Sequence, residues 1–260
     1  MKMKREHDFG LVLSGGGAKG AAHIGVLKAM EERGIMPSIV SGTSAGAIVG
    51  SLYCNGLSSE EILDIFLNTS VFRPAFYTWR KPGVLNINPL SKVLEPHFKI
   101  DSFEALKYPC YIVATDITRA KQYVFSKGPI IQSILASACF PGIFAPVEIG
   151  DSLYSDGGIL NNFPTEPIVH KCERIIGVNI QHIDPVDKKE LKSTFGVVQR
   201  VYSISTKFAS IAKYQDCEIV IAPPELNKFN TFDMYKIKNM YEIGYRHACL
   251  VFDEYLSKQS

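Results

Sequence analysis

The chain has 260 residues, of which 46% are hydrophobic and 21% are charged, so it can bury a core of ordinary size. Its 28 lysine and arginine residues nearly balance 26 aspartate and glutamate residues, so the overall charge gives no reason to expect nucleic acid as a partner. No stretch approaches the roughly 18 consecutive apolar residues of a membrane-spanning helix, and the N-terminus MKMKREHDFG lacks the apolar region of a secretion signal, so we expect a cytoplasmic protein.

The cysteines are scattered along the chain. They form no CxxC pair and no group with histidine, so we predict no zinc site and no other cofactor, and thiols in a chain without a secretion signal are expected to stay reduced. The six are Cys54, Cys110, Cys139, Cys172, Cys217 and Cys249.

The first part of the chain contains two strand–turn–helix units. Residues 9–14, FGLVLS, form an apolar run typical of a buried strand, and a glycine loop and a helix at 21–33 follow. Residues 38–56 repeat this plan, with a short strand, a turn of small residues and a second helix. Ser58 and Glu61 have the spacing of a capping box and predict a third helix.

The rest of the chain continues the alternation of strands and helices. We predict strands at 109–118 and 121–126, a helix that begins at Pro129, a hairpin within 144–158 that turns at Gly150 and Asp151, strands at 175–180 and 218–223, and a long helix at about 234–256. This alternation indicates an α/β protein with three layers, α/β/α, and a mostly parallel central sheet. We expect a single domain over 1–260, with a motif-bearing core at about 9–164 and C-terminal strands and helices at about 165–260.

The glycine loop at residues 14–20, SGGGAKG, matches the pattern GxGxxG between a strand and a helix. A dinucleotide-binding fold would also need an acidic residue roughly 20 positions further on, at the end of the second strand, and none is there. A P-loop is excluded because Lys19 is followed by Gly20 rather than by serine or threonine. What remains is a set of backbone amides at a helix N-terminus that can stabilise an anion, including a developing oxyanion.

The segment GTSAG at residues 42–46 matches GxSxG. Gly42 and Gly46 leave room for a strained turn that presents the Ser44 hydroxyl above the sheet, and the amide of Ala45 then lies at a helix N-terminus as an oxyanion donor. The pattern alone is common, so Ser44 is a candidate nucleophile that needs a base.

The base can be a histidine or an aspartate. Asp156 follows a strand-like segment, and Gly157 and Gly158 allow the chain to turn sharply, so that its carboxylate could act as a general base if burial raises its pKa. In the order Ser…Asp…His, His182 or His247 could complete a triad, although neither lies in a constrained loop. The six histidines are His7, His23, His97, His170, His182 and His247.

Taken together and in this order, GGGAKG, GTSAG, ASACFPGIFAPVEI and DGG followed by NNFP resemble the patatin-like phospholipase family, in its compact bacterial stand-alone form. The resemblance covers residues 9 to about 164 and implies a patatin-like fold and a serine hydrolase with a Ser–Asp dyad. It implies Ser44 as the nucleophile, Asp156 as the base, and the amides of Gly15, Gly16 and Gly17, with Ala45, as the oxyanion hole. DGG stands where plant members have DGA.

The family resemblance implies cleavage of fatty acyl esters of phospholipids or lysophospholipids without a metal. The aromatic and basic segment 71–85, with Trp79, suggests a lid or a contact with the inner face of the membrane. Two alternatives stay open: a Ser-His-Asp carboxylesterase that acts on small esters, and a non-catalytic lipid-binding or regulatory protein with the same fold.

Overall fold

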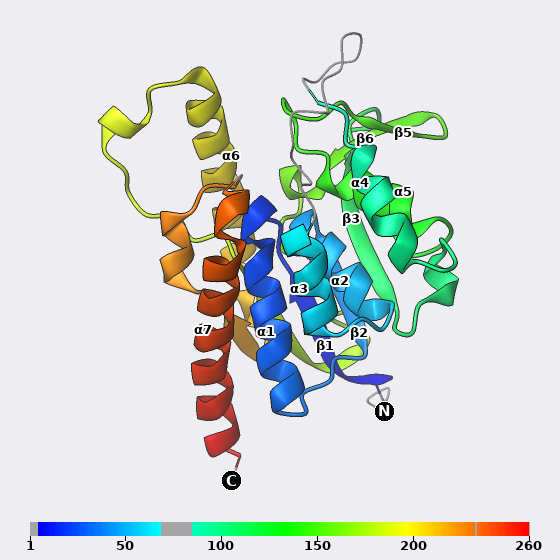
Figure 1. The fold of residues 1–260 in the computed structure, drawn as a ribbon, viewed down its shortest axis with the longest axis vertical. Helices are drawn as coiled ribbons and strands as arrows, with labels where there is room; N and C mark the ends of the chain where they lie inside the picture. Colours follow the sequence, from blue (N-terminus) through cyan, green and yellow to red (C-terminus); the bar gives the residue numbers. More distant parts are fainter. Residues whose placement is uncertain (1–4, 69–84, 232, 260) are drawn as a thin grey trace.

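The computed structural model describes residues 5–68, 85–231 and 233–259. Within these residues, eight strands form one sheet in the order β5-β6-β3-β2-β1-β7-β8, and β4 pairs with β3 outside this path (Figure 1). The strands are β1 (His7–Leu13), β2 (Ile39–Thr43), β3 (Cys110–Asp116), β4 (Lys121–Phe125), β5 (Val147–Ile149), β6 (Ser152–Asp156), β7 (Cys172–Val178) and β8 (Ile219–Ile221).

The central part of the sheet is parallel. The pairs β3–β2, β2–β1, β1–β7 and β7–β8 run in the same direction, whereas β4 and β6 are antiparallel to β3 and β5 is antiparallel to β6. Helices flank this sheet, so the predicted α/β class with a mostly parallel sheet is confirmed. The helices are α1 (Ala21–Glu32), α2 (Ala45–Cys54), α3 (Ser59–Asn68), α4 (Pro89–Leu94), α5 (Ile130–Ala138), α6 (Thr194–Ile211) and α7 (Ile237–Ser257).

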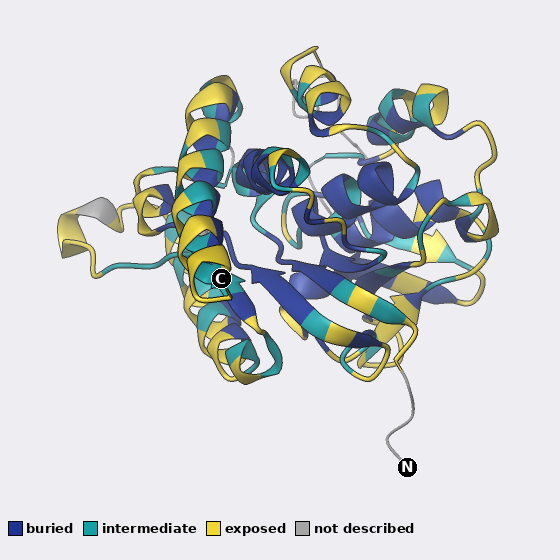
Figure 2. Ribbon diagram, turned by 90° about the horizontal axis from the view of Figure 1, so that it is seen from below, coloured by how far each residue is buried: buried dark blue, intermediate teal, exposed yellow. Residues whose placement is uncertain are grey.

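The alternation of side chains along β1 divides the core between the two faces of the sheet. Leu11 and Leu13 belong to the larger apolar cluster, which also contains the buried residues of α1, α2, α5 and α7. Val12 points to the other face and packs in a smaller cluster with Phe163 and Ile168. Buried residues therefore cover both faces of the sheet (Figure 2).

Helices α1 and α7 lie side by side although they come from opposite ends of the chain (Figure 1). A Cβ atom at Gly25 of α1 would overlap the backbone of Tyr241, and one at Gly244 of α7 would overlap the backbone of Ala22. These two glycines allow the helix backbones to approach closely, because neither has a side chain at the crossing.

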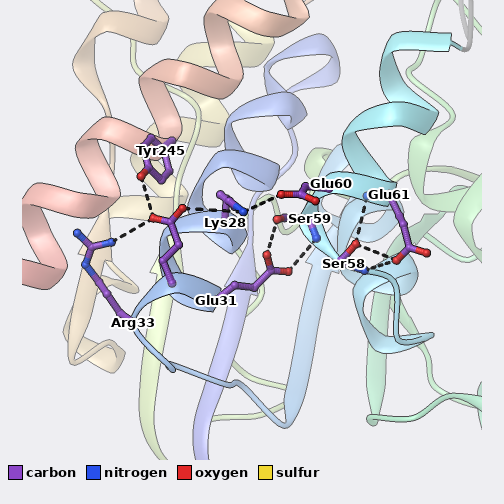
Figure 3. Close-up of polar contacts among 9 residues, drawn as sticks. Lys28, Glu31, Arg33, Ser58, Ser59, Glu60, Glu61 and Tyr245 are labelled. Atoms are coloured by element: carbon purple, nitrogen blue, oxygen red, sulfur yellow. Dashed lines mark hydrogen bonds and ion pairs between the residues drawn. The ribbon is translucent and has the colours of Figure 1, made fainter.

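The N-terminus of α3 forms the predicted capping box (Figure 3). The Ser58 amide donates to Glu61 Oε2 at 2.8 Å, and the Glu61 amide donates to Ser58 Oγ at 3.3 Å. Ser59 and Glu60 connect α3 to α1, through hydrogen bonds with Glu31 and Lys28. The box therefore fixes the start of a helix that is also linked to its neighbour.

Both predicted hairpins are present, as the antiparallel pairs β3–β4 and β5–β6. The long C-terminal helix begins at Ile237, three residues later than predicted, after a short 3-10 turn. Helix α6 was not predicted. Residues 71–84 of the proposed lid, with Trp79, lie outside the described residues. In the described part of the chain, no helix has both the length and the apolar character that crossing a bilayer requires.

Replacing the capping serine tests how much the box contributes to stability. Ser58→Ala should lower the free energy of unfolding in urea by about 1 kcal/mol, because it leaves the Glu61 amide without its acceptor. Asp64→Ala, at an exposed position of the same helix, is the matched control and should change the free energy of unfolding much less. Equal losses in the two variants would contradict a role for the box.

Candidate active site

Two strands end facing each other along one edge of β3. Strand β4 pairs with β3 residues 112–116 on one edge, so β2 and β6 must share the other edge. Strand β2 runs parallel to β3 and ends with Thr43 opposite Val113, and the antiparallel β6 ends with Asp156 opposite Ala114. Adjacent positions along a strand are about 3.3 Å apart, so the ends of β2 and β6 meet. Ser44 follows directly on Thr43 and therefore lies beside Asp156.

The turn at Ser44 is strained. Ser44 has φ 52° and ψ −118°, and among the described residues only Ala120 is another non-glycine residue with positive φ. A Cβ atom at Gly42 would crowd the Gly46 backbone, and one at Gly46 would overlap the Leu13 carbonyl group. The two glycines of GxSxG are thus needed because the backbone segments around Ser44 pass too close to each other for a side chain, and this packing holds Ser44 in its conformation.

Ser137 of α5 anchors the turn. The Ser44 amide donates to Ser137 Oγ at 2.8 Å, and the Ser137 hydroxyl donates to the Val113 carbonyl oxygen at 2.6 Å. This chain of hydrogen bonds links α5, the serine turn and β3, and it satisfies the Ser44 amide at a buried position. Ser137 could not be identified from the sequence, since a serine inside a predicted helix carries no signal of its own.

Asp156 is buried, with 2% of its surface exposed. Its carboxylate accepts hydrogen bonds from the Gly158 amide at 2.7 Å and from the Tyr202 hydroxyl at 3.4 Å. Burial raises the pKa of Asp156 to about 6, and the hydroxyl of Ser44 together with these two donors limits the rise because they stabilise the charged form. The carboxylate is therefore a stronger base than an exposed aspartate and lies beside the serine.

The glycine loop lies against Ser44, since a Cβ atom at Gly15 would be 3.2 Å from Ser44 Cβ. The predicted oxyanion hole needs one correction. The Gly15 amide donates to the Asn162 carbonyl oxygen at 3.2 Å, because the loop is tied there to the segment that follows Asp156, so this amide is not available to a ligand. The amides of Gly16 and Gly17 have no acceptor within the described residues, and with Ala45 at the N-terminus of α2 they remain the candidate donors.

A pocket surrounds Ser44 and Asp156. Its walls are mainly apolar and come from the glycine loop and from helices α2, α3, α4 and α5. The apolar side chains that line it are Ala18, Ala45, Ile48, Ile65, Phe66, Leu90, Val93, Leu94, Ala138, Phe140, Phe144 and Met234. The pocket thus brings the Ser44 hydroxyl and the Asp156 carboxylate next to a mainly apolar surface that can hold an apolar ligand.

Helix α6 contributes Tyr202 to this pocket, a residue that no sequence pattern had indicated. The Tyr202 ring packs edge-on against Phe140, with ring centroids 4.9 Å apart. Burial raises the pKa of the Tyr202 hydroxyl well above its usual range, so the hydroxyl keeps its proton and donates to Asp156. The hydroxyl also occupies the space that a Cβ atom at Gly158 would need. This contact explains why position 158, the second glycine of DGG, has no room for a side chain.

The histidines do not enter this site. None of the residues that line the pocket is a histidine. His23 is fully buried and its Nε2 contacts the Ser14 carbonyl oxygen at 2.8 Å, whereas His182 pairs with Asp184 at 3.0 Å. His247 lies on α7, and burial lowers its pKa. Within the described ranges, no three His, Cys, Asp or Glu side chains are grouped so that they could hold a metal ion.

The sequence of residues 11–169 matches the family described as patatin-like phospholipase. This match covers more than half of the chain and includes the glycine loop, the serine turn, α5 and the Asp156 turn. The chain belongs to the patatin-like phospholipase family.

Relatives of the chain include phospholipase-like proteins from animals and fungi. It is 27% identical to patatin-like phospholipase domain-containing protein 6 of Mus musculus over 278 residues, which cover 93% of this chain and 20% of the relative. It is 25% identical to lysophospholipase NTE1 of Kluyveromyces lactis over 272 residues, covering 92% of this chain and 19% of the relative. The chain thus spans about a fifth of the length of these curated relatives.

Among solved structures, VipD from Legionella pneumophila has a similar fold. The TM-score is 0.57 at 16% sequence identity, and the match covers 96% of this chain and 67% of the VipD chain. At this identity the similarity supports the patatin-like fold alone.

The contact between Gly158 and Tyr202 can be tested with a double-mutant series. Gly158→Ala should slow labelling of Ser44 by a fluorophosphonate probe roughly tenfold or more, because the new methyl group displaces Tyr202 or Asp156. Adding Tyr202→Phe removes the overlapping hydroxyl and should restore part of the labelling rate. Losses that simply multiply in the double variant would show that the two residues are not coupled.

Proposed function

We propose that this chain is a serine lipid acyl hydrolase that cleaves fatty acyl esters of phospholipids or lysophospholipids through a Ser44–Asp156 dyad. The observation that carries the proposal is the position of the strained, pocket-lining Ser44 beside Asp156, a buried carboxylate whose pKa is raised to about 6. The family assignment and the apolar pocket support the same reading, and the name of the fungal relative supports a lysophospholipid as one candidate substrate.

In the proposed reaction, Asp156 accepts the hydroxyl proton while Ser44 Oγ attacks the ester carbonyl carbon. The amides of Gly16, Gly17 and Ala45 stabilise the oxyanion of the tetrahedral intermediate. The intermediate collapses to an acyl-serine, and the alcohol leaves with the proton from Asp156. The same carboxylate then deprotonates a water molecule, which attacks the carbonyl carbon of the acyl-serine. The fatty acid is released as Ser44 Oγ takes the proton back from Asp156.

Tyr202 and Gly158 have a positioning role in this proposal. Both donate to Asp156 Oδ1, which orients the carboxylate. Tyr202 also lines the pocket, where its ring is held by Phe140. We expect these contacts to keep the base in place while the proton moves to and from it.

Two alternatives differ from the dyad in their requirements. A Ser-His-Asp carboxylesterase would need His182 or His247 at the serine, and neither lines the pocket. A non-catalytic lipid-binding protein would have no need for a base hydrogen-bonded to a serine on a strained turn. No contact in the described part of the site favours either alternative over the dyad.

The dyad is tested by removing each member. Ser44→Ala and Asp156→Ala should each lower kcat/KM for a soluble p-nitrophenyl ester by roughly 10³-fold or more, because nucleophile and base act as a unit. The matched controls are Asp151→Ala, an exposed aspartate in the preceding turn, and His182→Ala, and both should keep activity. Full activity in either dyad variant, or its loss in His182→Ala, would overturn the dyad.

The raised pKa of Asp156 predicts the pH dependence. Only the ionised carboxylate accepts the serine proton, so kcat/KM should fall as the pH drops through about 6 and should reach its plateau above that range. Tyr202→Phe removes a hydrogen bond that favours the charged form, so the acid limb should move to higher pH. A pH–rate profile with an uncharged ester measures both, and a limb that does not move in Tyr202→Phe would contradict the role of this hydroxyl.

A further inference from the structure

Helix α6 has its apolar residues on the outside. Val201 is 61% exposed and Phe208 is 71% exposed, and neighbouring residues on the same side are exposed as well. We call this surface the α6 apolar face, and its members are Val197, Val198, Val201, Ile204, Phe208 and Ile211.

Polar contacts on the inner side hold α6 in this orientation. Gln199 donates to Thr231 Oγ1 at 2.8 Å, and the Thr206 hydroxyl donates to Gln181 Oε1 at 2.6 Å. Tyr202, on the same side, bonds Asp156. Rotation that buried the apolar face would break these hydrogen bonds at partly buried positions, so the face stays outside.

The α6 apolar face forms one continuous stripe. Five of its members, at positions 197, 201, 204, 208 and 211, follow one another at intervals of four and three residues, which places them on one side of a helix. At 1.5 Å per residue the stripe is about 21 Å long. A contiguous apolar surface of this kind on a folded protein commonly marks a site of interaction.

The charges around the stripe are mostly positive. Helix α6 contains no acidic residue, and its only charged side chains, Arg200 and Lys207, donate to the backbone carbonyl oxygens of Asp184 and Ile183. The exposed residues Lys188, Lys189 and Lys192 precede it, with Asp187 and Glu190 as the acidic residues of that turn. Residues 187–211 therefore carry a formal charge of +3, whereas the whole chain carries +2. An apolar stripe beside basic residues is the pattern of a helix that lies in an anionic lipid interface.

The stripe is also next to the site. Tyr202 and Ser203, on the inner side of α6, line the catalytic pocket. Ile159 and Leu160, which follow directly on the Asp156 turn, are 36% and 48% exposed. The surface that carries exposed apolar side chains is thus separated from the pocket by the thickness of one helix.

We propose that the α6 apolar face docks the protein on an anionic lipid surface, with the stripe in the interface and the exposed Lys188, Lys189 and Lys192 at the head groups. The inference rests on the proposed function, since a lipid ester has to enter the pocket from such a surface. A second copy of the chain fits less well, because two α6 helices without acidic residues would bring like charges together.

Vesicle co-sedimentation tests the docking. The full chain with Ser44→Ala, which leaves the lipid intact, should bind vesicles of phosphatidylcholine and phosphatidylserine (7:3) more strongly than phosphatidylcholine alone. Adding Val201→Ser and Phe208→Ser should weaken binding tenfold or more. Leu250→Ser, at an equally exposed apolar position on α7, is the matched control and should bind as before. Added salt should weaken binding to the anionic vesicles.

Equal binding by the double variant and the Leu250 control would overturn the inference, as would a dimer in light scattering that dissociates only in the double variant, because the face would then join two copies. The same substitutions with Ser44 intact should leave hydrolysis of a soluble ester unchanged. Vesicle binding without any ester hydrolysis by the wild-type chain would overturn the proposed function but leave the docking face in place.

Discussion

The shared edge of β3 is the constraint on which the site depends. Strands β2 and β6 occupy successive parts of this edge from opposite directions, so their last residues, Thr43 and Asp156, lie at adjacent positions. Hydrogen bonds of the sheet, and not contacts between side chains, therefore bring the serine turn to the carboxylate. The register of two ladders determines this approach, and a shift of one residue in either would turn a side chain to the opposite face of the sheet.

Burial then gives the carboxylate its chemical character. A carboxylate removed from water holds its proton more tightly, and hydrogen bonds from Ser44, Gly158 and Tyr202 offset part of that effect. The outcome is a group that is ionised near neutral pH and is still basic enough to accept a proton. The same balance explains how a serine can be activated in the proposed mechanism without an imidazole, because the base contacts the hydroxyl directly.

Helix α6 connects the interior of the site with the surface. Its inner side supplies a hydroxyl to Asp156 and closes one wall of the pocket, and its outer side carries the apolar stripe. The inner side is held mainly by hydrogen bonds, with the Tyr202 ring against Phe140 as an apolar contact, whereas the aliphatic side chains of the stripe face outward. This is the reverse of the usual arrangement of an amphipathic helix. A surface contact at the stripe would thus act on the same rigid element that holds Tyr202.

Much of this protein is determined by local patterns in the sequence. The apolar runs, the glycines of the two loops, the capping box at Ser58 and the hairpin turns each depend on a few neighbouring residues, and they predicted the corresponding elements and the class of sheet. The candidate pair Ser44 and Asp156 came from the same kind of pattern, supported by the family resemblance.

Only the tertiary structure determined which contacts these elements make. It determined that the Gly15 amide donates to the Asn162 carbonyl oxygen, that Ser137 accepts from the Ser44 amide and that the Tyr202 hydroxyl donates to Asp156. It also decided which side of α6 faces inward. Helical periodicity shows which residues share a side, but the partners across the fold determine whether that side is buried, and in α6 those partners are polar.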